Sequence, residues 1–181
     1  MKEFVIPTLV LSMICLVCTG ALAATYQVAN PIIIENAQRK ADETRQMVLS
    51  AGAEFAPVEG FVAEGNVVDA YAAGNGAGYV ITTKAGGYGG DIQVMVGFTN
   101  DGVIDQVKVL SQTETSGLGS RVADEKYVLP GAGTTYCGQF AGKDASYVAG
   151  AEMIVGSTVS SKAVNDSVAL AFEVFNQVKG A

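Results

Sequence analysis

Histidine is absent from the 181-residue sequence, and cysteine occurs only three times. Without an imidazole, histidine-based acid–base catalysis and histidine metal sites are excluded. Three cysteines do not make a disulfide framework, so a domain built from this chain can fold without oxidation. Basic residues are also scarce, because 11 Lys and Arg stand against 18 Asp and Glu, giving a net charge of −7. This balance argues against nucleic-acid binding, which draws on basic patches.

Charge is missing altogether from residues 4–34. Within this gap, residues 4–25 are almost wholly apolar and, at about 1.5 Å per residue, long enough to cross a hydrocarbon core roughly 30 Å thick. We therefore expect residues 1–25 to form a single transmembrane anchor. A cleaved signal peptide is the alternative, since Ala21-Leu22-Ala23 fits a small-x-small cleavage site, but the preceding positive charge is only Lys2 and the terminal amine, offset by Glu3.

Cys15 and Cys18 form a Cys-x-x-Cys pair inside the expected span. Ligation of an iron–sulfur cluster together with partner subunits is one interpretation, and two small, soft apolar residues are the simpler one. We expect no metal site formed by this chain alone. The flanking cations do not set a clear orientation by the positive-inside rule, because they are Lys2 before the span and Arg39, Lys40 and Arg45 after it.

The rest of the chain predicts a linker helix followed by one domain. Residues 26–52 are expected to form the linker, since Ala37, Ala41, Thr44 and Val48 lie along one side of a helix over 32–49 and Ser50-Ala51-Gly52 then ends it. Residues 53–181 make up the domain. Cys137 is expected to be buried in it.

Alternating apolar residues predict strands in the first half of this domain. The expected strands are residues 67–72, 79–82, 92–98 and 103–110, and Thr99-Asn100-Asp101-Gly102 is a hairpin turn between the last two. Residues 121–128 predict a short helix at most, and the glycine-rich residues 131–142 a loop leading to a strand before 147–154. Antiparallel strands with flanking helices indicate an α+β domain.

A longer helix is predicted near the C-terminus. Its apolar stripe has the spacing of one helix face and consists of Val164, Val168, Ala171, Phe172, Phe175 and Val178. Upstream, the segment 152–161 reads Glu-Met-Ile-Val-Gly-Ser-Thr-Val-Ser-Ser. A glycine turn followed by hydroxyl residues at a helix N-terminus suits an anion, because unpaired N–H groups and the helix dipole both stabilise negative charge there. The alternative is that these hydroxyls only cap the helix.

Two further segments contain glycine next to residues suited to a flat ligand. Residues 112–119 read Gln-Thr-Glu-Thr-Ser-Gly-Leu-Gly, and residues 86–92 read Gly-Gly-Tyr-Gly-Gly-Asp-Ile. The glycines let a loop pass close to a ring system, which Leu118 or Tyr88 would cover. Ordinary glycine turns are the alternative interpretation. Neither segment is a Walker loop, because no Gly-Lys-Ser/Thr follows.

The three segments together resemble the FMN-binding domain family, and their order and spacing are similar to the G subunit of Rnf electron-transport complexes. Residues 152–161 resemble the family's flavinylation motif, with Glu152, Val155 and Ser157 in place of an aspartate, a small hydroxyl residue and an alanine. Residues 112–119 resemble its Glu-Thr-Pro-Gly-Leu-Gly segment, with Ser116 in place of the proline, and residues 86–90 its Gly-Tyr-Gly-Gly turn. A related protein is the C subunit of the sodium-pumping quinone reductase.

The resemblance implies an FMN whose phosphate is esterified to the hydroxyl of Thr158. It implies a ring site formed by Tyr88, Glu114, Thr115 and Leu118, and a phosphate site formed by Gly156, Ser160, Ser161 and Lys162. Gly117, Ser157 and Val159 are further cofactor contacts that it implies. It also implies an uncleaved anchor, with the domain on the outer face of the cell membrane.

The implied function is that of an electron-carrier subunit in a ferredoxin:NAD oxidoreductase complex that couples electron transfer to ion translocation. Such a subunit is part of a translocase and performs no complete turnover alone. The implied partners are the other subunits of the complex, a flavin transferase during maturation, and the membrane. Two alternatives remain: a covalent flavoprotein of another electron-transfer chain, and a non-redox anchored binding module in which the hydroxyl cluster is only a cap.

Overall fold

The computed structural model describes residues 2–179, with side chains from residue 5 onward. Met1, Gly180 and Ala181, the outermost residues of the predicted anchor and domain, lie outside the described residues. The chain divides into two units at residue 41, and each is described by itself.

The first unit is formed by helix α1, which runs from Lys2 to Val48 and contains Pro7 and Pro31. It is long and apolar enough to cross a membrane by length and composition. The side chains of Cys15 and Cys18 are exposed on it. The predicted anchor and linker are thus one continuous helix, whose last residues, 42–48, belong to the second unit. A division at residue 25 stays a prediction.

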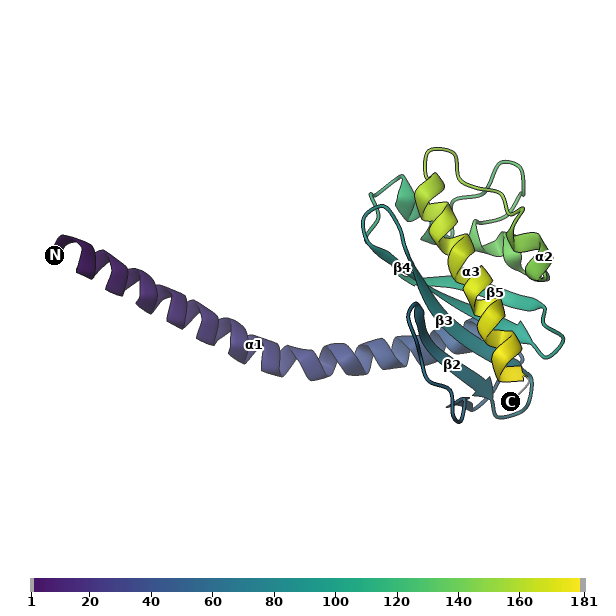
Figure 1. The fold of residues 1–181 in the computed structure, drawn as a ribbon, viewed down its shortest axis with the longest axis horizontal. Helices are drawn as coiled ribbons and strands as arrows, with labels where there is room; N and C mark the ends of the chain where they lie inside the picture. Colours follow the sequence, from purple (N-terminus) through teal and green to yellow (C-terminus); the bar gives the residue numbers. More distant parts are fainter. Residues whose placement is uncertain (1, 180–181) are drawn as a thin grey trace. The chain divides into compact units, whose positions relative to one another are not determined.

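The second unit contains one antiparallel sheet in which five strands follow one another in sequence order (Figure 1). The strands are β1 (Phe55–Pro57), β2 (Val67–Ala73), β3 (Gly78–Gly86), β4 (Asp91–Thr99) and β5 (Ile104–Ser111). Strands β3 and β4 pair over their full length, from Gly78 opposite Thr99 to Gly86 opposite Asp91. The four strands predicted within residues 67–110 are confirmed, while β1 was not predicted because three residues are too few to show an alternating pattern.

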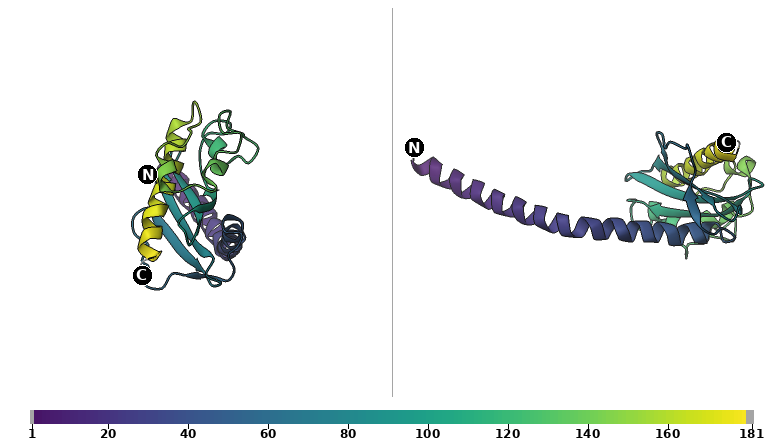
Figure 2. Two further views of the ribbon diagram at one scale, coloured as in Figure 1. Left: turned by 90° about the vertical axis from the view of Figure 1, so that its right-hand side faces the viewer. Right: turned by 90° about the horizontal axis from the view of Figure 1, so that it is seen from below.

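Helix α3 (Thr158–Lys179) covers one face of this sheet (Figure 2). The main core lies between them, and all six residues of the predicted apolar stripe are buried in it. The ring of Phe98 on β4 lies with its centroid 4.8 Å from that of Phe172 and 5.0 Å from that of Phe175. Thr83 of β3 donates a 2.9 Å hydrogen bond to the backbone oxygen of Ser167. The sequence-based α+β class is confirmed.

The opposite face of the sheet holds a smaller apolar cluster, made by Val48, Leu49, Ala73, Val80 and Met95. The alternation of β4 explains this division, because Ile92, Val94, Val96 and Phe98 face the main core and Met95 points the other way. Residues 42–48 carry the buried Arg45, whose guanidinium lies 3.6 Å from the ring centroid of Tyr71.

The segment between β5 and α3 differs from the prediction. It contains two short 3-10 helices, η1 (Gly119–Ala123) and η2 (Cys137–Phe140), and one turn of helix, α2 (Ala145–Val148). The strand predicted before residues 147–154 is wrong. Helix α2 begins there instead, at Ala145. Further along, the buried side chain of Gln139 pairs the backbone of Glu152: it accepts a 2.8 Å hydrogen bond from the Glu152 N–H and donates a 3.1 Å bond to the Glu152 carbonyl.

Candidate functional site

The carboxylate of Glu114 joins the three glycine-containing segments singled out in the sequence. Glu114 is buried in the loop after β5. Its Oε1 accepts a 2.9 Å hydrogen bond from the backbone N–H of Gly89 in the β3–β4 turn. Its Oε2 accepts a short hydrogen bond from the hydroxyl of Ser160 in the first turn of α3. Segments separated by 25 and 46 residues therefore meet at one side chain.

A pocket of about 540 Å³ opens where these segments meet. This volume lies within the range of about 300–1,000 Å³ that is typical of small-molecule and cofactor sites. Nine of the twelve predicted site residues line it, together with Gly119; the nine are Tyr88, Glu114, Thr115, Leu118, Gly156, Ser157, Thr158, Val159 and Ser160. The segments that the sequence linked only by resemblance thus share one cavity.

The N-terminus of α3 forms one end of the pocket. Gly156 turns the chain into the helix at a φ of 81°, a conformation that favours glycine. The Ser157 carbonyl accepts the first helical hydrogen bond, 2.9 Å from the Ser161 nitrogen, so Ser157 is the N-cap residue and Thr158 begins the helix. N–H groups of a first helical turn have no partner within the helix. They carry partial positive charge toward the exposed Thr158.

The hydroxyl of Ser157 is buried without a hydrogen-bond partner. An N-cap serine normally uses this oxygen to accept a hydrogen bond from the second or third N–H of its helix. Here the buried Ser157 hydroxyl has no partner and makes no capping bond to these N–H groups, at the wall of the same pocket. Burial of an unpaired hydroxyl costs free energy, so this arrangement suits an oxygen-rich ligand group that would pair with both.

Apolar side chains also line the pocket. Leu118 is 49% exposed, Val159 52% and Tyr88 78%, and all three line the cavity. Apolar side chains of this size usually lose most of their exposure in the core. Those around this pocket instead leave an apolar surface open to a ligand. The contact of Leu118 and Tyr88 with a ring stays a prediction. The exposed Thr115 supplies a polar group beside them.

Three predicted site residues do not line the pocket. Gly117 forms the turn before η1, where its N–H donates a 3.0 Å hydrogen bond to the Ser120 hydroxyl. Ser161 is fully buried, and its hydroxyl accepts a 3.1 Å bond from the Ile154 N–H. Lys162 is exposed and forms an ion pair with Asp166 one helical turn later, with nitrogen–oxygen distances of 2.6 and 2.8 Å.

Some contributions to the site had no clear signal in the sequence. Gln139 holds the backbone of Glu152 from a region predicted only as a loop. The hydroxyl of Ser160 was predicted for the phosphate end, whereas it is bonded to Glu114. Val155, which departs from the family pattern, is 92% exposed, so this departure leaves the pocket wall unchanged.

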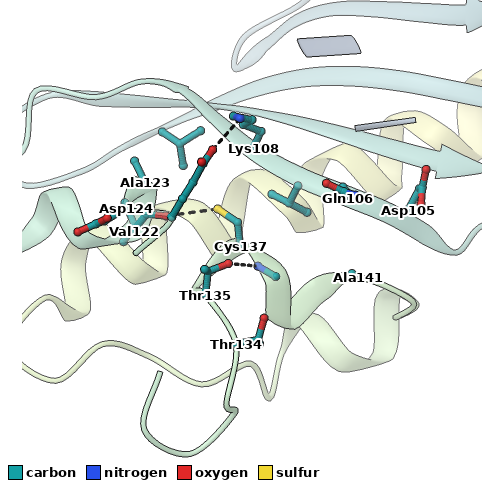
Figure 3. A pocket seen from close by; sticks show the side chains of 14 residues that line it. Asp105, Gln106, Lys108, Val122, Ala123, Asp124, Thr134, Thr135, Cys137 and Ala141 are labelled. Atoms are coloured by element: carbon teal, nitrogen blue, oxygen red, sulfur yellow. Dashed lines mark hydrogen bonds and ion pairs between the residues drawn. The ribbon is translucent and has the colours of Figure 1, made fainter. Parts of the chain in front are cut away.

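A second pocket, of about 400 Å³, lies beside β5 and η2 (Figure 3). Lys108 and Glu125 form an ion pair of 2.7 Å across part of it, which lowers the pKa of Glu125. Cys137 points into it and donates a 3.3 Å hydrogen bond to the Val122 carbonyl. Burial raises the pKa of this thiol to about 12. The expected burial of Cys137 is confirmed in part, because the residue keeps some exposure.

One comparison with known proteins concerns the part of the chain that contains the first pocket. Residues 87–173 match the model of the family described as the FMN-binding domain. This range contains the Tyr88 turn, Glu114 and the N-terminal half of α3, and so every residue that lines the pocket.

Three curated relatives match nearly the whole chain. The G subunit of the Na⁺-translocating ferredoxin:NAD⁺ oxidoreductase complex of Acetobacterium woodii is 29% identical, over 94% of this chain and 90% of its own. The G subunit of the proton-translocating ferredoxin:NAD⁺ oxidoreductase complex of Clostridium ljungdahlii is 27% identical, over 90% and 86%. The G subunit of the ion-translocating oxidoreductase complex of Methanosarcina acetivorans is 29% identical, over 99% and 98%.

These matches confirm the resemblance inferred from the motifs: residues 87–173 are similar to the FMN-binding domain family, and nearly the whole chain is similar to the G subunits of ion-translocating oxidoreductase complexes.

Proposed function

We propose that this chain is the covalent-FMN electron-carrier subunit of a membrane-bound, Rnf-type ferredoxin:NAD oxidoreductase complex that couples electron transfer to ion translocation. FMN is held by a phosphoester to the Oγ1 atom of Thr158. The observation that carries the proposal is the position of Thr158: an exposed hydroxyl on the first residue of α3, at the wall of a pocket in an FMN-binding domain.

The phosphate end of the cofactor fits the N-terminus of α3. A phosphodiester at Thr158 keeps one negative charge, which the helix dipole and the unpaired N–H groups of the first turn stabilise. The hydroxyl of Ser157, buried without a partner at the same wall, is free to donate to a phosphate oxygen. The attachment itself requires a flavin transferase and a flavin dinucleotide as donor. The Thr158 oxygen attacks the phosphorus of the FMN half and loses its proton, while the phosphoanhydride bond breaks and the nucleoside monophosphate leaves.

The ring end fits the apolar side of the pocket. Leu118 and Val159 would contact the isoalloxazine, and the exposed Tyr88 would flank it. Thr115 offers a hydroxyl to a polar ring edge. When bound, FMN supplies the redox chemistry. The residues of this chain would position the ring and exclude water from part of it. The covalent bond would keep FMN attached outside the cell membrane, where a lost cofactor is not easily replaced.

Helix α1 and the relatives support the membrane location and the partner subunits that we propose for this chain. Helix α1 is apolar enough to anchor the domain in the cell membrane as a single uncleaved span, and we place the domain on the extracytoplasmic side. The relatives are named as subunits of complexes, so the electron donor and acceptor are expected in partner subunits. The net charge of −7 argues against nucleic acid as a partner.

The proposal is tested by expressing the full chain in membranes with a flavin transferase and inspecting a denaturing gel for flavin fluorescence. Wild-type protein is expected to give a fluorescent band, and Thr158→Val none, because the ester oxygen is lost. Thr134→Val, which removes a hydroxyl from the second pocket, is the matched control and should fluoresce like wild type. A fluorescent band from folded Thr158→Val would exclude the assigned attachment site.

A further inference from the structure

We propose that Glu114 is a positioning residue whose carboxylate ties the Tyr88 turn to the first turn of α3 and thereby sets the shape of the flavin pocket. This inference rests on the proposed function, because it concerns the site assigned to FMN. It differs from the role that the resemblance implied for Glu114, which was to form part of the flavin ring site.

Both oxygens of the Glu114 carboxylate accept hydrogen bonds from other parts of the chain. Its Oε1 accepts from the Gly89 N–H at 2.9 Å, and its Oε2 accepts from the Ser160 hydroxyl. Hydrogen bonds to a charged acceptor are roughly twice as strong as those between neutral groups. Glu114 is also held along its own backbone, since its N–H donates to the Gln112 side-chain oxygen at 2.6 Å. A fixed backbone with two fixed oxygens leaves the side chain little freedom.

The neighbouring glycines fit closely around this carboxylate. A Cβ atom at Gly119 would overlap both the Glu114 carboxylate and the Ser160 hydroxyl, and a Cβ atom at Gly87 would overlap the same carboxylate. These glycines therefore make room for Glu114. From the sequence, Gly119 was expected to let its loop approach the ligand, whereas in the structure it makes room for the side chains of Glu114 and Ser160.

The two tied segments carry opposite parts of the proposed site. Gly89 follows Tyr88, which flanks the ring end, and Ser160 is two residues beyond Thr158, which carries the phosphate end. The tie thus fixes the distance between the two ends of the pocket. The turn has a second attachment, a 3.1 Å hydrogen bond from the Thr113 hydroxyl to the Gly89 carbonyl. Loss of the carboxylate is therefore expected to loosen the pocket locally and to leave the sheet folded.

Two substitutions at Glu114 separate geometry from charge. Glu114→Ala removes both acceptors. Glu114→Gln keeps the length of the side chain: its amide oxygen can accept from Gly89, and its NH₂ group can donate to the Ser160 hydroxyl, which reverses its own direction. A tie that acts by geometry is therefore rescued by glutamine and lost with alanine.

The first measurement uses flavin-free full-length protein in detergent, so that it does not depend on the proposed function. Native-state hydrogen exchange at the Gly89 amide should be about tenfold faster in Glu114→Ala than in wild type. Glu114→Gln should stay within about threefold of wild type. Ser160→Ala removes only the hydrogen bond between the Ser160 hydroxyl and Glu114, so hydrogen exchange at the Gly89 amide should be unchanged. Glu125→Ala, which removes a paired carboxylate from the second pocket, is the matched control.

The second measurement uses flavin-loaded protein and iodide quenching of the native flavin fluorescence. We expect the quenching constant to rise at least about twofold in Glu114→Ala and in Ser160→Ala, and to stay at the wild-type value in Glu114→Gln and Glu125→Ala. A purely structural contribution would lower thermal stability without changing flavin access. Unchanged exchange and quenching in Glu114→Ala, or a Glu114→Gln variant that behaves like alanine, would overturn the positioning role. If the wild-type protein takes up no covalent flavin, the proposed function fails. The exchange experiment then still tests whether Glu114 holds the Tyr88 turn in place.

Discussion

The hydroxyl of Tyr136 lies 2.8 Å from the side-chain oxygen of Asn165, deep between η2 and α3. The same hydroxyl is 2.8 Å from the backbone oxygen of Ser161. Tyr136 and Asn165 are both buried. This contact holds the glycine-rich segment before η2 against the first turns of α3, the part of the helix that presents Thr158 to the pocket.

Tyr136→Phe is expected to lower the free energy of unfolding by about 1–3 kcal/mol, because the buried oxygens of Ser161 and Asn165 lose the one O–H donor that they share while the ring packing is kept. Guanidinium unfolding followed by near-ultraviolet circular dichroism of the tyrosines measures the change. Tyr127→Phe, at a half-buried position nearby, is the matched control and should change stability by less than about 0.5 kcal/mol. Equal stability of wild type and Tyr136→Phe would show that the contact is unimportant.

Two neighbouring groups, the hydroxyl of the buried Tyr136 and the thiol of the half-buried Cys137, are expected to make stability depend on pH. Burial raises the pKa of Tyr136 well above its usual value near 10, and raises the pKa of Cys137 from about 9 to about 12. Both groups bind their proton more tightly in the folded chain, so their contribution is complete below about pH 9 and is lost as pH rises toward 12. Unfolding midpoints should therefore be flat from pH 7 to 9 and fall above it. The fall should be smaller in Cys137→Ala, and a wild-type midpoint constant to pH 11 would contradict this.

Ser157→Ala is expected to have opposite effects in the two forms of the protein. Replacing an N-cap serine by alanine usually costs about 0.5–2 kcal/mol, but this hydroxyl is buried without a partner, so its removal should leave the flavin-free protein as stable as wild type or up to about 1 kcal/mol more stable.

In the flavin-loaded form, Ser157→Ala loses the donor proposed for the phosphate. Thermal melts of both proteins, with and without covalent FMN, should show that flavin loading raises the melting temperature less in the variant. A flavin-free variant that is clearly less stable than wild type would mean that the hydroxyl caps the helix after all.

The fold was largely predictable from local patterns. Alternation in residues 92–98 and the turn at residues 99–102 predicted β4 and its hairpin, and the stripe from Val164 to Val178 predicted the buried face of α3. These elements are regular enough for one face to be read directly from the spacing of apolar residues. The segment between β5 and α3 was not predictable in this way. Within it, the side chain of Gln139 pairs the backbone of Glu152, 13 residues further along the chain. No periodic pattern in the sequence reveals such a contact.

The candidate site was predictable as a set of segments and much less as a set of contacts. Thr158, Ser157 and Leu118 line the pocket as the resemblance implied. Glu114 and Ser160 were assigned to the ligand, yet they bond to each other across 46 residues of sequence. Lys162 was assigned to the phosphate, and it pairs with Asp166 one turn along α3. Residue type suggests what a side chain can bind, and only the packing of distant segments determines which partner it meets.

The most direct test of the account is the mass of intact protein purified from membranes that contain a flavin transferase. We expect the full chain to carry the added mass of one FMN less one water, and fragmentation to place that mass on Thr158. The same spectrum should show residues 1–25 still attached. A chain without the flavin mass, or with the mass on another residue, would contradict the central claim that Thr158 holds a covalent FMN.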